Sequence, residues 1–330
     1  SFPTAIHIAS LHLAQGLTKV LDELIVSLED KEKEFDTVIK MGRTHLQDAV
    51  PIRLGQEFGA YKRVLKRDFS RISRSVESLH EINMGATAVG TGLNAKPEYI
   101  EKVAQYLADL TEMPFHSAEN LVDATQNTDA YTELSAALKV HAINLSKMAN
   151  DLRLMSSGPR TGLNEINLPA RQPGSSIMPG KVNPVMAEVM NQISFQVIGN
   201  DHTISLASEA GQLELNVMEP VLVFNLLQSL SVLQNGLNVF REHAVNGITA
   251  NVERCKELVE KSVGIITAIN PHVGYETASR IAKEAIETGR SVREICLERG
   301  ILSEEELDEI LDAKEMTRPG IAGARFMNLE

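Results

Sequence analysis

Tryptophan is absent from this chain, and aromatic residues make up only 4% of its 330 positions. Hydrophobic residues nevertheless reach 43%, so a large core must be built from Leu, Ile, Val, Ala and Met. Strands of β-sandwiches favour aromatic and β-branched side chains. The composition therefore favours a helical fold over a β-sandwich.

Cysteine is also scarce. Cys255 and Cys296 are far apart in the chain and have no metal-ligand spacing. We therefore expect no disulfide framework and a reducing compartment, the cytoplasm. The nine histidines show no His-Glu-x-x-His or His-x-His pattern, so we expect no catalytic metal and no cofactor.

Positive charge is in the minority, with 32 Lys and Arg against 44 Asp and Glu and a net charge of −12. This balance argues against binding to nucleic acid or to an anionic membrane surface. No signal peptide and no apolar run of about 18 residues is apparent, so no membrane span is expected. An anionic substrate must therefore meet positive charge that is gathered locally.

Apolar residues recur at steps of three and four over five long stretches, which predicts long helices. The predicted helices cover residues 3–30, 56–82, 118–155, 186–209 and 220–245. The last one is apolar almost all round, and such a helix is buried on every side. One chain of this size could scarcely cover several such helices. We therefore expect an all-α fold, a long-helix bundle whose central helices pack against those of other subunits. A short strand is suggested only near residues 49–54.

The character of the sequence changes after about residue 252, where the helical stretches become shorter and more charged. Ser303 and Glu306 have the spacing of a capping box, which predicts a short helix up to about residue 313. We expect residues 1–252 to form a central bundle domain carrying the site motifs. Residues 253–330 are expected to form a small C-terminal helical domain.

The glycine-rich stretch 85–92 could be taken for a phosphate-binding loop. It lacks a Lys-Ser/Thr ending and no strand precedes it, so it does not fit a nucleotide site. We expect these glycines to let the chain turn and pack closely.

A polar loop is predicted at residues 174–184, GSSIMPGKVNP. Glycine and proline interrupt regular structure there, and helices are predicted not far on either side. Lys181 offers a positive charge, Asn183 can donate and accept, and Ser175 and Ser176 bring hydroxyl groups. These groups suit an anionic substrate. The alternative is a flexible surface linker, although linkers seldom combine Met, Ile and Val with Ser and Gly.

A second polar segment, residues 42–48, lies between two predicted helices. Thr44, His45 and Gln47 can hydrogen-bond a carboxylate or an amine, and Arg43 adds positive charge. A single histidine is more often structural, so a polar turn stays the alternative. A third segment, residues 208–216, brings Gln212, Glu214 and Asn216 between two apolar helices. A structural role is favoured there over a role in supporting the site.

GSSIMPGKVNP resembles the signature loop of the aspartase/fumarase superfamily, and GRTHLQDAVP at residues 42–51 resembles its second site-forming motif. The resemblance extends over essentially all 330 residues. Residues 42–58, 168–192 and 207–221 are more similar to the aspartase branch than to fumarases. The resemblance implies a lyase that reversibly eliminates ammonia from L-aspartate to give fumarate. It also implies a homotetramer whose active sites are shared between subunits.

The resemblance further implies three catalytic residues: Ser175, His45 and Glu188. Ser175 would be the base of an anti-elimination that passes through an aci-carboxylate. A serine is a poor base at neutral pH, so nearby cations and N–H donors must stabilise its oxyanion. Glu188 would pair with His45, favouring the imidazolium or fixing its tautomer.

Substrate contacts are implied for Thr44, His45, Ser176, Lys181 and Asn183. Lys181 and Asn183 would bind the carboxylate and amino ends of the substrate, and Ser176 would donate to a carboxylate. Such donors lower the barrier when they meet the charge that develops on the aci-carboxylate.

One departure from the family pattern stands out. The superfamily has an N-terminal domain ending in a Ser-Ser/Thr-Asn-Asp substrate motif, and this chain begins just after that point. We therefore expect the N-terminal domain to be absent and the site to be incomplete, and full turnover of L-aspartate to fumarate would refute the incompleteness. Two alternatives stay open: a fumarase, which hydrates fumarate to L-malate, and a truncated non-catalytic relative resembling the crystallins. Without the missing motif, the sequence does not decide between aspartate and malate.

Overall fold

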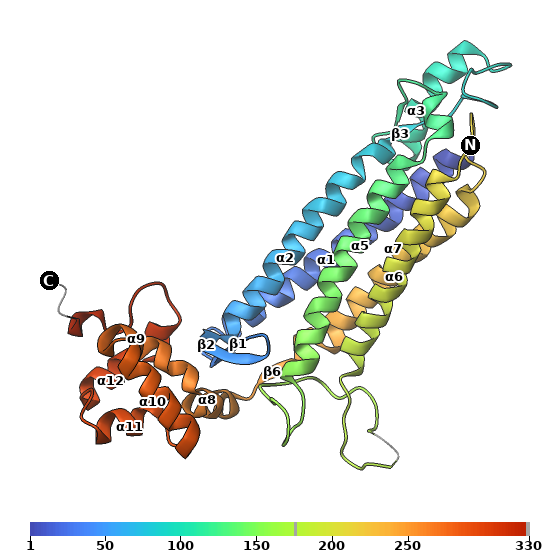
Figure 1. The fold of residues 1–330 in the computed structure, drawn as a ribbon. Helices are drawn as coiled ribbons and strands as arrows, with labels where there is room; N and C mark the ends of the chain where they lie inside the picture. The colour runs from blue at the N-terminus through green and yellow to red at the C-terminus, as the bar shows by residue number, and fades with distance from the viewer. Residues whose placement is uncertain (175–176, 328–330) are drawn as a thin grey trace. The chain divides into compact units, whose positions relative to one another are not determined.

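The computed structural model describes residues 1–174 and 177–327, and these residues form a mostly helical chain (Figure 1). The all-α prediction is confirmed, with short two-stranded sheets as the exceptions among the described residues. The chain divides into two compact units. The first contains residues 1–27, 61–154 and 168–247, and the second contains 28–60, 155–167 and residues from 248 onward.

Five long helices form the first unit and run alongside one another (Figure 1). They are α1 (Phe2–Glu34), α2 (Leu54–Ser75), α5 (Asp129–Met155), α6 (Val185–Glu209) and α7 (Glu219–His243), with the end of α1 and the start of α2 belonging to the second unit. Shorter elements complete this unit: a 3₁₀ turn (Glu77–His80), β3 (Glu81–Ile82), α3 (Pro97–Thr111), β4 (His116–Ser117), α4 (Asp123–Gln126) and a 3₁₀ turn (Val245–Gly247). Strands β3 and β4 pair in parallel.

Leucine dominates the interior of this bundle. Fully buried leucines repeat along α1, α5 and α7 at helical spacing, and they include Leu17, Leu21, Leu24, Leu134, Leu138, Leu145, Leu222, Leu226, Leu230, Leu233 and Leu237. The opposite faces of α6 and α7 are apolar but exposed. Phe195 and Phe224 keep 62% and 65% of their surface accessible. Within this chain, α7 is therefore buried on one face only.

Buried polar contacts join neighbouring helices of the bundle. Asn144 of α5 donates to both carboxylate oxygens of Asp68 on α2, at 2.9 and 3.0 Å. Ser135 of α5 donates to Asp201 of α6 at 2.8 Å. A buried polar group is costly unless it is paired, so these contacts fix which faces of the helices meet.

The second unit combines small sheets with short helices. Strands β1 (Ile39–Thr44) and β2 (Gln47–Arg53) form an antiparallel hairpin, and β5 (Ile166–Asn167) pairs with β6 (Thr249–Ala250). The C-terminal elements are α8 (Val252–Lys261), a 3₁₀ turn (Val263–Ile265), α9 (Ile266–Val273), α10 (Tyr275–Thr288), α11 (Val292–Glu298), α12 (Glu304–Ile310), α13 (Ala313–Met316) and a 3₁₀ turn (Ala324–Phe326). The predicted capping box at Ser303 and Glu306 is present and opens α12.

Two predicted helix boundaries are wrong. We expected a helix to continue through residue 82, but α2 ends at Ser75 and the chain tightens into a 3₁₀ turn. Val76 and Leu79 are three residues apart, which fits a 3₁₀ turn as well as an α-helix, and Ile82 lies in β3. Leu79 and Ile82 are both buried, so their burial satisfied the apolar pattern without a continuous helix.

The helix expected from residue 118 begins only at Asp129. The side chain of Asn120 accepts hydrogen bonds from the backbone N–H groups of Val122 and Asp123, which starts the separate short helix α4. Asn127 then takes an extended conformation and separates α4 from α5. Local side-chain hydrogen bonds of this kind compete with a continuous helix.

The glycine-rich stretch 85–92 turns the chain, as predicted. Gly85, Gly90 and Gly92 have φ values of +95°, +92° and +70°. A Cβ on Gly90 would lie 2.3 Å from Cα of Val122, so the position requires glycine for close approach as well as for its conformation.

Candidate active site

Thr44 and His45 lie at the tip of the β1–β2 hairpin rather than in a turn between helices. Thr44 pairs with Gln47, which leaves His45 and Leu46 as a two-residue turn. Their φ values are +55° and +60°, so both lie in the left-handed region. A two-residue hairpin turn of type I′ needs positive φ at both positions, and Asn-Gly usually supplies it.

This tip places strained residues at the surface. A left-handed conformation costs a non-glycine residue of the order of 1–3 kcal/mol, and such strain clusters at functional sites. His45 is exposed and Leu46 keeps 70% of its surface accessible, so packing of these side chains does not explain their conformation. The geometry presents an imidazole and the neighbouring Thr44 hydroxyl to solvent, where both can meet a ligand.

A buried ionic cluster lies beneath the hairpin tip. Glu165 is fully buried, and its Oε1 accepts a hydrogen bond of 2.7 Å from Nη1 of Arg43. Nζ of Lys40 lies 3.1 Å from the other carboxylate oxygen of Glu165 and 2.9 Å from Glu57. The contact between Lys40 and Glu165 is an ion pair without hydrogen-bond geometry. We expected Arg43 to add charge for a substrate, but its guanidinium is paired inside the protein.

Cys255 packs against the same cluster. Its Sγ donates to the backbone carbonyl of Glu165 at 3.5 Å. Burial raises the pKa of the Cys255 thiol to about 12, and the negative charge of Glu165 adds to this effect. The group is therefore a neutral thiol at physiological pH and part of the packing rather than a nucleophile.

The serine loop belongs to the first unit and precedes α6. Ser175 and Ser176 lie outside the described residues. On either side of them the loop folds back on itself: a Cβ on Gly174 would lie 1.9 Å from the backbone oxygen of Lys181. The side chain of Lys181 is exposed, and Asn183 is half-buried. The positive charge predicted for this loop is therefore accessible.

Glu188 occupies the first turn of α6, where a carboxylate is favoured by the positive end of the helix dipole. Its Oε1 lies 3.9 Å from Nη2 of Arg153 on α5. Lys181, Asn183 and Glu188 thus share one end of α6, whereas Thr44 and His45 share the hairpin of the second unit. The pairing of Glu188 with His45 stays a prediction, because it joins the two units.

Comparison with known proteins places these motifs in a family. Residues 1–199 match the family model described as lyase, and residues 265–318 match the one described as fumarase C C-terminus. Aspartate ammonia-lyase of Bacillus subtilis is 67% identical over 326 residues, which cover 99% of this chain and 69% of that protein. Its counterpart in Escherichia coli is 48% identical, with coverage of 99% and 68%.

The chain belongs to the aspartase/fumarase superfamily. Among solved structures, the fumarate lyase:delta crystallin from Brucella melitensis bound to cobalt superimposes with a TM-score of 0.93 at 46% identity, covering 96% of this chain and 69% of that one. The class II fumarase from Schistosoma mansoni gives 0.90 at 37% identity, covering 96% and 70%. The chain therefore spans about two thirds of the length of these superfamily members.

The third polar segment of this superfamily member has a structural centre. Asn216 is buried and donates to the carbonyls of Ala207 and Ser208 at 3.0 and 3.2 Å, and its Oδ1 accepts from the N–H of Met218 at 2.9 Å. It thereby joins the end of α6 to the start of α7. Gln212 and Glu214 are exposed, so their role stays a prediction.

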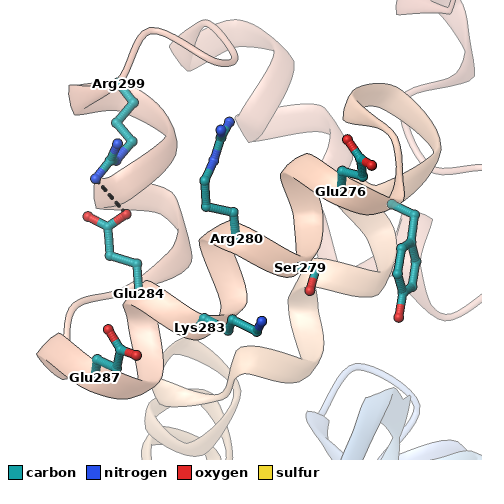
Figure 2. Close-up of a pocket in the computed structure, with 8 residues that line it drawn as sticks. Glu276, Ser279, Arg280, Lys283, Glu284, Glu287 and Arg299 are labelled. Atoms are coloured by element: carbon teal, nitrogen blue, oxygen red, sulfur yellow. Dashed lines mark ion pairs between the residues drawn. The ribbon is translucent and has the colours of Figure 1, made fainter.

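The second unit also contains a cavity of about 660 Å³ along α10 (Figure 2). Arg280 and Lys283 project from α10 beside Glu276 and Glu287, and Arg299 pairs with Glu284 at 2.8 Å. The lining contains three positive and three negative side chains, so its net charge is zero. Among the described residues, none of those predicted for the site lines this cavity.

Across residues 1–174 and 177–327, no group of three His, Cys, Asp or Glu side chains gathers in a metal-binding arrangement. Within the same ranges, no helix has the length and apolar character needed to cross a bilayer.

Sequence reasoning missed Glu165, which organises the base of the hairpin. Its partners Arg43 and Lys40 lie more than one hundred residues earlier in the chain, and Arg43 and Glu165 are 122 positions apart. No local pattern joins residues at that separation. The one available signal was a carboxylate between the apolar residues Leu163 and Ile166, in a segment without charge periodicity.

Proposed function

We propose that this superfamily member is an aspartate ammonia-lyase, which converts L-aspartate reversibly into fumarate and ammonia. The observation that carries the proposal is the identity of 67% to the Bacillus subtilis aspartate ammonia-lyase over 99% of the chain. Both site motifs, GRTHLQDAVP and GSSIMPGKVNP, are intact in the sequence. The exposed Thr44 and His45 and the accessible Lys181 charge support the proposal.

The proposed reaction removes a proton from the carbon β to the amino group. Ser175 takes the proton as its oxyanion, and the electron pair of the C–H bond forms an aci-carboxylate with two negative charges on one carboxyl group. Collapse of this intermediate forms the double bond of fumarate and expels the amine as ammonia. Donors that meet the developing charge lower the barrier.

The substrate contacts are divided between the two motifs. Thr44 and His45 would bind from the strained hairpin tip, with Glu188 pairing to His45. Ser176, Lys181 and Asn183 would bind from the loop before α6. An exposed ammonium such as that of Lys181 suits a dicarboxylate, because the protein as a whole is negatively charged.

We also propose that the enzyme is a homo-oligomer, a tetramer by family resemblance, with active sites shared between subunits. The exposed apolar faces of α6 and α7 support this proposal. Phe195 and Phe224 are each more than half exposed, and Leu206 keeps 56% of its surface accessible. Contiguous exposed apolar surface is typical of an interaction face.

Fumarase activity is the second candidate. The match of residues 265–318 to the fumarase C C-terminus and the 37% identity to a class II fumarase favour it. It would use the same serine loop to remove water rather than ammonia from its substrate. The higher identity to the aspartate ammonia-lyases places it second.

The deciding experiment compares L-aspartate with L-malate as substrates of the purified protein. Fumarate is a conjugated diacid and is detected by its ultraviolet absorbance. The proposal predicts growth of the signal with L-aspartate and little with L-malate. A signal with L-malate alone would assign the chain to the fumarases.

A further inference from the structure

The hairpin tip presents a physical problem that its own sequence does not solve. His45 and Leu46 adopt φ values of +55° and +60° without being glycine or asparagine. Strain of this kind persists only where surrounding structure over-determines the conformation. Something beneath the tip must therefore hold the two strands in this register.

Glu165 is placed to provide that constraint. Its own backbone is fixed twice, because its N–H donates to the carbonyl of Met155 at 2.8 Å and its carbonyl accepts from the N–H of Asn251 at 2.9 Å. Its buried carboxylate then holds Arg43 and Lys40, which are both on β1. Arg43 is the residue directly before Thr44, so the ion pair fixes the strand one step from the proposed substrate contacts.

The other strand of the hairpin, β2, is held by a hydrogen bond to Asp48. Oδ2 of Asp48 on β2 accepts a hydrogen bond of 2.7 Å from Ser262. Nε of Arg43 lies 3.7 Å from Asp48, the residue opposite it in the hairpin register. The side chain of Met41 is fully buried in the apolar cluster formed with the C-terminal helices. The base of the hairpin is thus fixed on both strands.

We propose that Glu165 is a positioning residue, which holds the His45–Leu46 tip in its left-handed conformation through Arg43 and Lys40. This inference rests on the proposed function for its consequence in catalysis. Glu165 does not touch the substrate in this proposal. Its carboxylate acts through Arg43 on the orientation of the Thr44 hydroxyl and the His45 imidazole.

A purely structural role is the competing explanation, since any buried carboxylate stabilises the fold through its partners. Asp68 offers a matched control. It is fully buried and bonded to Asn144, His141 and Arg71, so its partners belong to α2 and α5 of the first unit. Glu165→Gln and Asp68→Asn both remove one buried negative charge while preserving shape.

The experiment measures kcat and KM for L-aspartate together with thermal stability. Both variants are expected to lower stability, because each leaves buried cationic or polar partners uncompensated. Only Glu165→Gln is expected to raise KM, by about tenfold, which corresponds to about 1.4 kcal/mol of binding free energy. Its kcat should change by less than about threefold. Equal KM values for Glu165→Gln and Asp68→Asn would overturn the proposal.

A double-mutant cycle with His45→Ala separates positioning from general destabilisation. If Glu165 acts through the tip, Glu165→Gln should raise KM by about tenfold in the native background and by less than about threefold beside His45→Ala. Equal factors in the two backgrounds would contradict a positioning role. If Glu165→Gln fails to fold, Arg43→Lys keeps the charge but shortens the link, and an intermediate rise in KM is expected.

Hydrogen exchange tests the same inference without reference to the reaction. The two variants are compared at the same free energy of global unfolding. The amides of residues 43–48 should then exchange at least about tenfold faster in Glu165→Gln than in Asp68→Asn. Unchanged exchange would overturn the positioning role. Inactivity of the native protein toward L-aspartate would overturn the proposed function instead, and the exchange result would still decide the role of Glu165.

Discussion

The β1–β2 hairpin and the loop before α6 carry the two halves of the proposed site and are built in opposite ways. The hairpin stands on a buried ionic cluster, with Glu165 fully buried and Lys40 only 4% exposed. In the loop, Ile177 keeps 86% of its surface accessible, and Lys181 is exposed. One half is thus fixed by charge inside the protein, whereas Ile177 and Lys181 of the other half are exposed to solvent.

This difference separates binding from chemistry in the proposed mechanism. A strained tip on a fixed base can hold the substrate in one orientation, because its conformation is over-determined. The loop carries the base Ser175, whose removal would act on the reaction step itself. Changes in the hairpin should therefore act mainly on KM, whereas loss of Ser175 should act mainly on kcat.

The largest effect is expected for Ser175→Ala. Loss of a general base should lower kcat for L-aspartate by about 10³-fold or more, because no other group would take the β proton. Fumarate absorbance measures the rate, and size-exclusion chromatography checks that assembly is unchanged. Turnover within about tenfold of the native rate would remove Ser175 from the role of base.

A smaller effect, on KM rather than on kcat, is expected for His45→Asn. Asparagine tolerates the left-handed region, so the hairpin and its stability should be preserved. Loss of the imidazole contact should raise KM for L-aspartate by about tenfold or more. Thermal unfolding provides the control. An unchanged KM would contradict the assignment of substrate binding to the hairpin.

One contribution to the pH dependence of stability should come from a group outside both regions. Burial lowers the pKa of His7 to about 4, and Nδ1 of His7 lies 2.8 Å from the carbonyl of Leu79. His7 is therefore neutral in the folded state, whereas the unfolded chain binds a proton below about pH 6.5. The stability contributed by neutral His7 is present above pH 6.5 and is lost as the pH falls toward about 4.

The slope of this loss is at most about 1.4 kcal/mol per pH unit. His7→Asn has no proton to take up, so its unfolding free energy should fall less steeply between pH 6.5 and pH 4. Denaturant unfolding at several pH values measures the difference. Identical slopes in the two proteins would show that His7 does not control the acid sensitivity.

The smallest effect is expected for Leu46→Gly. Leu46 has a φ of +60° and 70% of its surface is exposed, so glycine should relieve strain while losing little packing. We expect an increase of about 1 kcal/mol in unfolding free energy, partly offset by the greater freedom of glycine in the unfolded chain. A decrease in stability would show that the tip is not strained.

The long helices could be predicted because their apolar residues repeat with helical spacing. The predictions for residues 3–30, 186–209 and 220–245 agree closely with α1, α6 and α7. Strand β1 was missed because its six residues include Lys40, Gly42 and Arg43, which interrupt any apolar alternation. Those charged side chains face Glu165, so the feature that concealed the strand is the one that anchors it.

The site itself divides in the same way. Thr44, His45, Lys181 and Asn183 could be predicted from the sequence, because each lies in a short motif that is continuous along the chain. The left-handed turn at His45 and Leu46 could not be predicted, since both positions lack the Asn-Gly pair that usually marks such a turn. The division of the chain at residue 252 and the pairing of Glu188 with His45 both stay predictions.

The most direct test of the ammonia-lyase assignment is the amount of ammonia released per molecule of fumarate formed from L-aspartate by the native protein. Elimination at the amino-bearing carbon predicts the two products in equal amounts, with both lost in Ser175→Ala. Absence of ammonia during L-aspartate incubation, together with fumarate formation from L-malate, would contradict it.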